Sequence, residues 1–167
     1  YKRVEEKLIL QIDRMDNGLF YKIDSPYKIL DLDAIIDGFN ATWEETIDSD
    51  KLFMEAVRVA EIIFVHVIRK ENSMIKAMQL VEEKIKTVQN NILLLDEYMP
   101  YSEAIFTSKN DLAKTIKVVI LPSNRGGYNI KPLTVSSDSK DLVVNWPKNY
   151  RGKRDKELAL LTGVKTA

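Results

Sequence analysis

One uninterrupted helical pattern, over residues 49–89, constrains the fold more than any other feature of this 167-residue chain. The segment contains neither Pro nor Gly, and its apolar residues recur every three or four positions, as in an amphipathic helix. Asp48 or Ser49 can cap its start. A continuous helix would be roughly 60 Å long, more than one small domain needs, so part of it must pack on something else. A break around Lys70–Ser73 is the alternative.

Two shorter helices are predicted before it. The first carries apolar residues at helical spacing and ends at Asn17–Gly18, where glycine suits a left-handed terminal residue. Its apolar residues are Val4, Leu8, Ile12 and Met15. The second follows Asp31 and ends near Gly38, with Leu32, Ile35, Ile36 and Phe39 as its apolar residues. Asp24–Pro26 predicts a turn between the two.

The pattern changes after residue 91, where short apolar runs bounded by turn-forming residues predict strands. The runs are Ile92–Leu95, Lys117–Leu121 and Tyr128–Leu133, with Ala104–Phe106 as a further candidate. Asn124–Gly127 predicts a hairpin turn, and Asn110 can cap a helical turn through Ala113. Asp155 is predicted to cap a terminal helix that reaches Leu161 and closes at Gly163. The predicted fold is α+β, with long helices packed on a small, mainly antiparallel sheet.

Composition excludes several kinds of site. Lys plus Arg equals Asp plus Glu at 25 each, so there is no global positive field and any nucleic-acid contact must be local. The chain has no Cys and a single His, His66, which excludes thiolate chemistry and zinc sites built from several His or Cys ligands. No apolar run approaches the roughly 20 residues of a membrane span, so we expect a soluble, cytoplasmic protein.

A segment near the C-terminus, Trp146–Leu158, combines aromatic residues, a turn glycine, two arginines and an acidic helix start. Together with Leu161–Val164, it resembles the closing motif of the Myg-type hydrolases, relatives of the DHH phosphoesterases that include RecJ-like exonucleases. Three further islands match in the same order along the chain. They are Ile12–Gly18, Asn40–Trp43 and Ala77–Glu83.

The resemblance implies the C-terminal part of a metal-dependent phosphoesterase. Residues 1–45 then correspond to the end of a DHH-like catalytic domain and its connector, and residues 46–167 to a C-terminal substrate-positioning domain. Neither the Asp-His-His metal motif nor the family's glycine-containing C-terminal loop occurs here, so we expect a fragment, with a complete small protein lacking the catalytic half as the alternative. Tyr150 stands where family members often carry Trp, a mild departure.

Asp13 and Asp16 lie three residues apart on the first helix, so their carboxylates share a face and suit one Mg²⁺ or Mn²⁺ ion. The alternative is that Asp16 helps to end the helix while Asp13 is solvated. The resemblance places this Asp-x-x-Asp-Asn-Gly near the last metal-binding Asp of RecJ-like enzymes. Because the other ligands are missing, we expect no catalytic residue here and no phosphodiester cleavage by this chain alone.

Arg151, Lys153 and Arg154 surround Gly152 at the entrance to the last helix, where guanidinium groups and unpaired backbone N–H groups can face one phosphate. This is the predicted substrate-binding site. In the alternative, Trp146 and Tyr150 pack on the domain while the arginines pair with Asp155, Glu157 or other acidic residues. Basic residues beside aromatic ones also suit single-stranded nucleic acid.

Two other motifs favour structural roles. Arg125–Gly127 lacks the spacing and the following helix of a phosphate loop, so it predicts a hairpin turn. His66 lies in an apolar stretch, where a partly buried core or interface residue is expected rather than a catalytic base.

The apolar residues over 56–68 spread around the helix, which predicts burial on more than one side. We expect the partner to be either a catalytic domain or a second copy, giving a homodimer through residues 49–89. The expected function is a nuclease on single-stranded nucleic acid that uses Mn²⁺ or Mg²⁺. The alternatives are a non-catalytic dimerisation domain and a hydrolase of nucleotides or other small phosphoesters.

Overall fold

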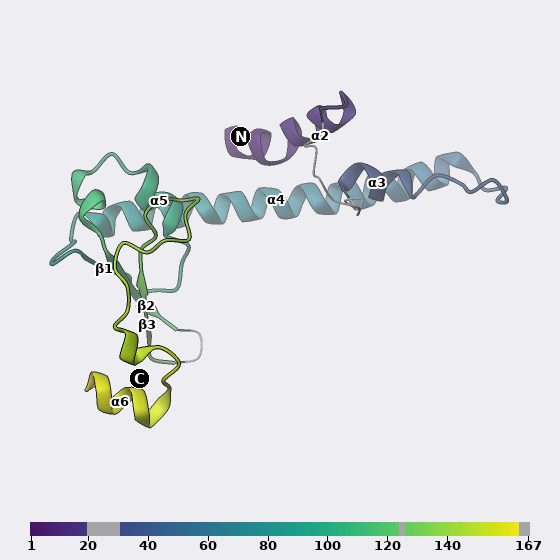
Figure 1. The fold of residues 1–167 in the computed structure, drawn as a ribbon. Coiled ribbons are helices and arrows are strands. Elements are labelled where there is room, and N and C mark those ends of the chain that lie inside the picture. The colour runs from purple at the N-terminus through teal and green to yellow at the C-terminus, as the bar shows by residue number, and fades with distance from the viewer. Residues whose placement is uncertain (20–30, 124–125, 164–167) are drawn as a thin grey trace. The chain divides into compact units, whose positions relative to one another are not determined.

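The computed structural model describes residues 1–19, 31–123 and 126–163. The chain divides into two compact units, residues 1–73 and 74–167, and one helix, α4, continues from the first unit into the second. Figure 1 shows the order of the elements along the chain.

The first unit begins with the first predicted helix, which spans residues 2–16. It consists of α1 (Lys2–Val4), a π-helical turn (Glu5–Ile9) and α2 (Leu10–Asp16). In the π turn the Leu10 amide donates to the Glu5 carbonyl, a widening that the apolar spacing did not foresee. The predicted end is confirmed, because Gly18 has φ +70°.

The second predicted helix is confirmed as α3 (Leu32–Asp37). Asp31 Oδ1 accepts a hydrogen bond from the Ala34 amide at 2.9 Å, which fixes the start of the helix. Gly38 follows the last helical residue. The turn predicted at residues 24–26 lies outside the described residues.

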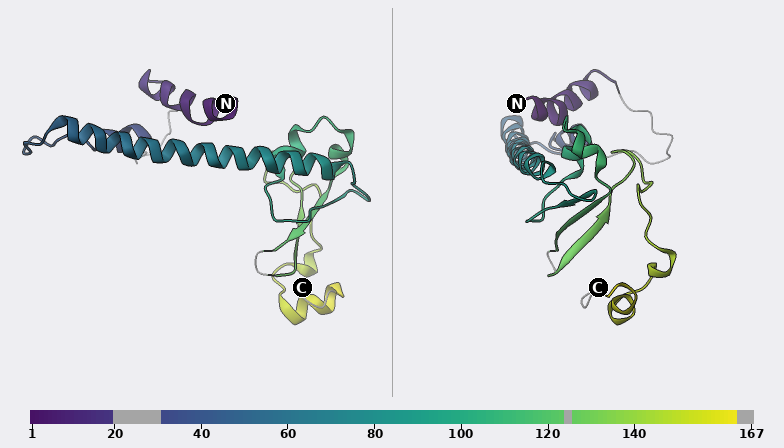
Figure 2. Two further views of the ribbon diagram at one scale, coloured as in Figure 1. Left: turned by 180° about the vertical axis from the view of Figure 1, so that it is seen from behind. Right: turned by 90° about the vertical axis from the view of Figure 1, so that its left-hand side faces the viewer.

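The long helix is continuous. α4 (Ser49–Ile85) has 37 residues, which corresponds to about 55 Å, and Figure 2 shows it unbroken from behind. Asp48 Oδ1 accepts from the Asp50 amide at 3.0 Å and caps its start. The alternative of a break at residues 70–73 is therefore wrong, and the reason is that this segment contains no helix-breaking residue.

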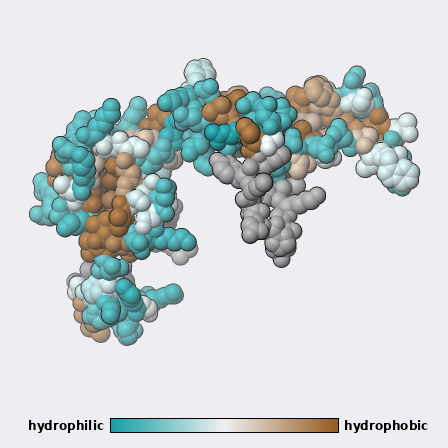
Figure 3. Space-filling model, turned by 45° about the horizontal axis from the view of Figure 1, so that its top comes forward, coloured by the Kyte–Doolittle hydropathy of each residue, from teal (hydrophilic) through white to brown (hydrophobic). Residues whose placement is uncertain are grey.

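Much of the apolar surface of α4 within the first unit is exposed. Phe53 is 65% exposed and Phe64 41% exposed. Figure 3 shows brown apolar surface along the part of the chain that holds α3 and the start of α4. The apolar residues over 56–68 were predicted to be buried on more than one side of the helix. Within the described residues they are not, since Val57, Ile62 and Val65 are also exposed.

The second unit contains a three-stranded sheet of β1 (Ile92–Leu94), β2 (Val118–Pro122) and β3 (Tyr128–Pro132). β2 lies in the centre, with β1 parallel to it and β3 antiparallel to it. The α+β class and the β2–β3 hairpin are confirmed. The sheet is mixed rather than mainly antiparallel, because the chain crosses over through α5 and η2 between β1 and β2.

The core of the second unit forms between one face of this sheet and the last turns of α4. Leu93, Val119 and Leu121 alternate with more exposed neighbours, and they join Val81 and Ile85 in one buried cluster. Each of these five side chains is at most 1% exposed. The period of two along the strands and of three to four along the helix explains which residues meet.

The segment between β1 and β2 corrects one prediction. Ala104–Phe106 is not a strand but part of helix α5 (Ser102–Thr107). Three apolar residues are too few to distinguish the two periods. Here the Ile105 amide donates to the Tyr101 carbonyl at 3.1 Å, and Ala104 and Ile105 are buried. The turn predicted after Asn110 is confirmed as the 3₁₀ helix η2 (Asp111–Thr115).

The chain ends in two short helical elements, η3 (Lys148–Tyr150) and α6 (Asp155–Thr162). Gly163 closes α6 with φ +73°, as predicted. The predicted cap is wrong. Arg154 occupies the N-cap position, no side chain caps this end, and Asp155, where α6 begins, has a left-handed φ of +47°.

Candidate functional site

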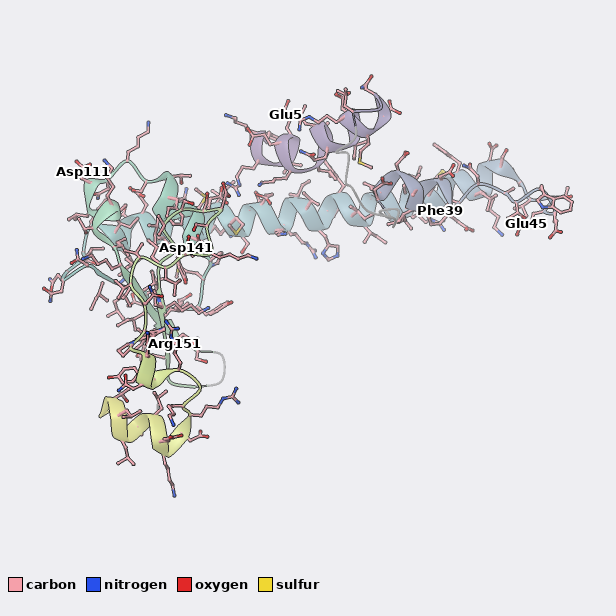
Figure 4. All side chains as sticks on the ribbon, viewed as in Figure 1. Glu5, Phe39, Glu45, Asp111, Asp141 and Arg151 are labelled. Atoms are coloured by element: carbon pink, nitrogen blue, oxygen red, sulfur yellow. The ribbon has the colours of Figure 1, made fainter. Side chains whose placement is uncertain are left out.

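Four residues between η3 and α6, Arg151 to Arg154, form what we term the basic turn. The Lys153 amide donates to the Tyr150 carbonyl at 3.2 Å, which closes the turn. Gly152 has φ +75°, a conformation that favours glycine, so the chain can reverse between the two arginines. Figure 4 labels Arg151 in the connection that precedes α6.

The charges of the basic turn are not equivalent. Lys153 forms an ion pair with Glu157, one turn along α6. The side chains of Arg151 and Arg154 are exposed, and neither takes part in an ion pair within the described part of the chain. The alternative that the arginines pair with Asp155 or Glu157 is not what the structure shows, because Lys153 takes Glu157. Two guanidinium groups therefore remain available to an anion.

α6 begins at Asp155, directly after the basic turn in the chain. Because no side chain caps it, amides of the first turn have no side-chain acceptor. The positive end of the helix dipole adds to the same field. Two arginines and an uncapped helix start are together a geometry that can bind a phosphate group.

The predicted metal ligands lie at the end of α2. Asp13 and Asp16 are both exposed, and Asp13 Oδ1 accepts from Asn17 Nδ2 at 3.2 Å. Across residues 1–19, 31–123 and 126–163, no three His, Asp or Glu side chains gather closely enough to hold a metal ion. These two aspartates can supply two oxygen ligands, so on the described residues they do not make a complete metal site.

Two other motifs from the sequence are His66 and Arg125–Gly127. His66 is exposed on α4, so of the two predicted positions the core is wrong and the interface stays a prediction. Gly126 and Gly127 both have positive φ and lie between β2 and β3, as the predicted hairpin turn requires. Arg125 lies outside the described residues.

A cavity of about 600 Å³ in the second unit was not predicted. Its walls include the aromatic rings of Tyr98, Tyr101 and Phe106, and Lys131 of β3 also lines it. Burial, with a smaller contribution from the neighbouring Tyr98, raises the pKa of Tyr101 above its usual value. The aromatic residues around Pro100 were the available signal, but the assignment of residues 104–106 to a strand hid it.

Another exposed aromatic residue belongs to the Asn40–Trp43 island. Trp43 is 92% exposed, in a turn where Glu45 Oε2 accepts from both the amide and the hydroxyl of Thr42 at 2.9 Å. These two hydrogen bonds lower the pKa of Glu45 below its usual value. The turn therefore presents the indole ring to solvent.

Within the residues described, no helix combines the length and the apolar character that crossing a bilayer demands.

Comparison with known proteins gives the family. Residues 1–167, the whole chain, match the family model MYG1_exonuc, which is described as "Uncharacterised protein family (UPF0160)". The MYG1 protein of Dictyostelium discoideum is 22% identical over 179 residues, which cover 98% of this chain and 54% of that protein. The MYG1 protein C694.04c of Schizosaccharomyces pombe is 22% identical over 176 residues, with the same shares covered. No solved structure matches.

The chain thus spans about half the length of these relatives. The resemblance drawn from the Trp146–Leu158 motif and the three islands is confirmed by a match that extends over every residue. The chain belongs to the MYG1 family, UPF0160.

Proposed function

We propose that this chain is the C-terminal, substrate-positioning part of a metal-dependent phosphoesterase that acts as an exonuclease on single-stranded nucleic acid. The observation that carries the proposal is the basic turn, in which Arg151 and Arg154 are exposed and without an acidic partner among the described residues. The name of the family model, MYG1_exonuc, supports the same class of activity.

This chain can contact nucleic acid through a local phosphate site. The formal net charge is zero, so attraction of a polyanion depends on where the positive charges gather. The basic turn carries two exposed arginines and is followed directly by the uncapped start of α6, and guanidinium groups and first-turn amides can each donate to phosphate oxygens. Lys153 lies in the same turn, but its ion pair with Glu157 reduces its contribution to phosphate binding.

In the complete protein we propose a DHH-type division of labour. Residues 1–45 would complete a catalytic domain and residues 46–167 would position the substrate. A divalent metal ion, Mn²⁺ or Mg²⁺, would activate water there, with Asp16 and Asp13 as contributors to its ligands. This chain alone is then inactive, and we propose that the protein acts in the cytoplasm, in keeping with a sequence without cysteine.

Binding of a short fluorescent single-stranded oligonucleotide tests the function. We expect saturable binding that weakens as salt is added, because counterions are released from the phosphates. Replacing Arg151 and Arg154 together by Ala should abolish most of it, whereas the control Lys140→Ala, in an exposed loop, should not. Binding that both variants retain equally would contradict the proposal. Mononucleotides that bind as tightly as the oligonucleotide would instead favour a hydrolase of small phosphoesters.

A specific observation also favours a second function, homodimerisation through the helical region 49–89. Phe53 and Phe64 on α4 are exposed, and at about 100° per residue they lie within about 20° of each other around the helix axis. A second copy could cover this stripe. The two functions are compatible, because the stripe belongs to the first unit and the basic turn to the second.

A further inference from the structure

The lining of the cavity of the second unit includes three aromatic side chains and two methionines. It measures about 600 Å³, within the range of roughly 300–1,000 Å³ of small-molecule sites. Tyr98, Met99 and Tyr101 come from the segment that precedes α5, and Phe106 comes from α5 itself. Flat, polarizable walls of this kind suit a planar aromatic ligand.

The floor of the cavity is fixed before any ligand arrives. Met99, Tyr101 and Phe106 are partly buried and pack against the hydrophobic core, and they also line the cavity. Tyr98 differs from them because it is 58% exposed. The cavity therefore has a preformed floor and one aromatic ring at its edge that contributes little to the core.

Two charged side chains line the same cavity. Lys131 projects from β3, and within the described part of the chain its ammonium group forms no ion pair. Glu103 brings a carboxylate from α5. A ligand with several phosphate groups would be repelled by this carboxylate more strongly than a ligand with one. A neutral aromatic ring that carries one anionic group can stack on the aromatic walls and also pair with the Lys131 ammonium group.

We propose that this cavity binds the base of a single unpaired nucleotide, stacked beside Tyr98 and Tyr101, with Lys131 near the phosphate of the same nucleotide. The choice of a nucleotide among aromatic anions rests on the proposed function. Stacking of a base on an aromatic side chain is sequence-tolerant, because every base has a π-face. The cavity would hold one base while the basic turn holds a phosphate elsewhere on the strand.

Titration of the whole chain with adenosine 5′-monophosphate, followed by NMR of the backbone amides, tests this inference. We expect saturable shifts at residues 98–106 and around Lys131, which are distinct from any shifts that the phosphate causes at the basic turn. Tyr98→Ala should raise the Kd about fivefold or more. Its matched control is Tyr128→Ala, another exposed tyrosine of the second unit, which is 68% exposed and does not line the cavity.

The lysine is tested by comparing two ligands. Lys131→Ala should weaken adenosine 5′-monophosphate about threefold and leave adenosine, which has no phosphate, unchanged. Lys140→Ala serves as its control. Both test residues are exposed, so an unchanged amide spectrum without ligand would show that the variants are folded.

Three results would overturn the proposal. These are no saturable shift for the wild-type chain, shifts that Tyr98→Ala and Lys131→Ala leave unchanged, and equal or tighter binding of free phenylalanine at the same residues. The oligonucleotide assay with the basic-turn variants is separate. If adenosine 5′-monophosphate binds in this cavity while no oligonucleotide binds to the chain, the nuclease proposal fails and the nucleotide pocket stands.

Discussion

The side chain of Arg3 donates from Nε to Glu71 Oε2 at 2.7 Å, which joins two residues that are 68 positions apart in the sequence. Both belong to the first unit. Glu71 is only 6% exposed, and it is the one charged residue buried among those the structure describes. A buried carboxylate is costly without a partner. The pair therefore specifies where α1 docks along α4.

Arg3→Leu should destabilise the first unit by about 2 kcal/mol, because it leaves the Glu71 carboxylate buried without this cation. Amide hydrogen exchange of residues 2–16 measures the effect as faster exchange. The control is Lys2→Leu, since the Lys2–Glu6 pair is exposed and should contribute under about 0.5 kcal/mol. Equal acceleration in both variants would show that the buried pair does not dock the helix.

Adjacent leucines on β1 should respond differently to truncation. Leu93 is 0% exposed and Leu94 is 54% exposed. Leu93→Ala should lower the free energy of unfolding by about 3 kcal/mol through lost burial and a new cavity, whereas Leu94→Ala should lower it by under about 1 kcal/mol. Urea unfolding at equilibrium measures both. Similar losses would mean that the sheet buries a different face.

The partial burial of Tyr101 predicts that the folded protein loses stability at alkaline pH. Burial favours its neutral form and raises its pKa in the folded state. The resulting stability is fully present below the pKa of the unfolded chain, about 10, and is lost as pH rises through the folded pKa. Tyr101→Phe should reduce this alkaline loss and remove a late-titrating transition from the tyrosinate absorbance. A titration curve unchanged in shape would contradict the assigned burial.

The exposed stripe on α4 predicts self-association. Phe53→Gln with Phe64→Gln should shift the chain from dimer towards monomer in sedimentation velocity at high concentration, because the apolar area that drives association is removed. Ile62→Gln is the control. Ile62 is 58% exposed, but it lies about 180° from Phe53 around the helix. A strictly monomeric wild-type chain would remove the homodimer proposal.

The absence of phosphodiester cleavage is also testable. The purified chain with Mn²⁺ or Mg²⁺ should leave a single-stranded oligonucleotide intact, because a two-metal site needs more ligands than Asp13 and Asp16 provide. Measurable metal-dependent cleavage that Asp13→Asn and Asp16→Asn abolish would contradict this expectation.

Local signals were sufficient for much of the fold. Apolar residues that recur every three to four positions over a long segment predicted α4. Asp31 and Asn110 predicted the starts of the helices that they cap, and Gly18 and Gly163 predicted helix ends. The failures are at short or ambiguous segments. Ala104–Phe106 fits either period, and tertiary burial of Ala104 and Ile105 decided for a helix.

The residues of the candidate sites were also predicted only in part. Adjacent residues, such as those of the basic turn, can be recognised from sequence because the chain itself brings them together. The aromatic cavity joins Tyr98 to Lys131, and the buried pair joins Arg3 to Glu71. Such long-range contacts depend on packing that no local pattern contains. At Asp155 a good capping residue was visible, but the backbone placed Arg154 at the cap position instead.

The salt dependence of oligonucleotide binding tests the proposed phosphate site most directly. For single strands the slope of log K against log salt is about −0.7 per phosphate contact. Replacing Arg151 and Arg154 by Ala should therefore make the slope shallower by about 1.4 and weaken binding for every sequence tested. A slope that the double variant leaves unchanged would contradict the assignment of the basic turn as the site that holds the strand.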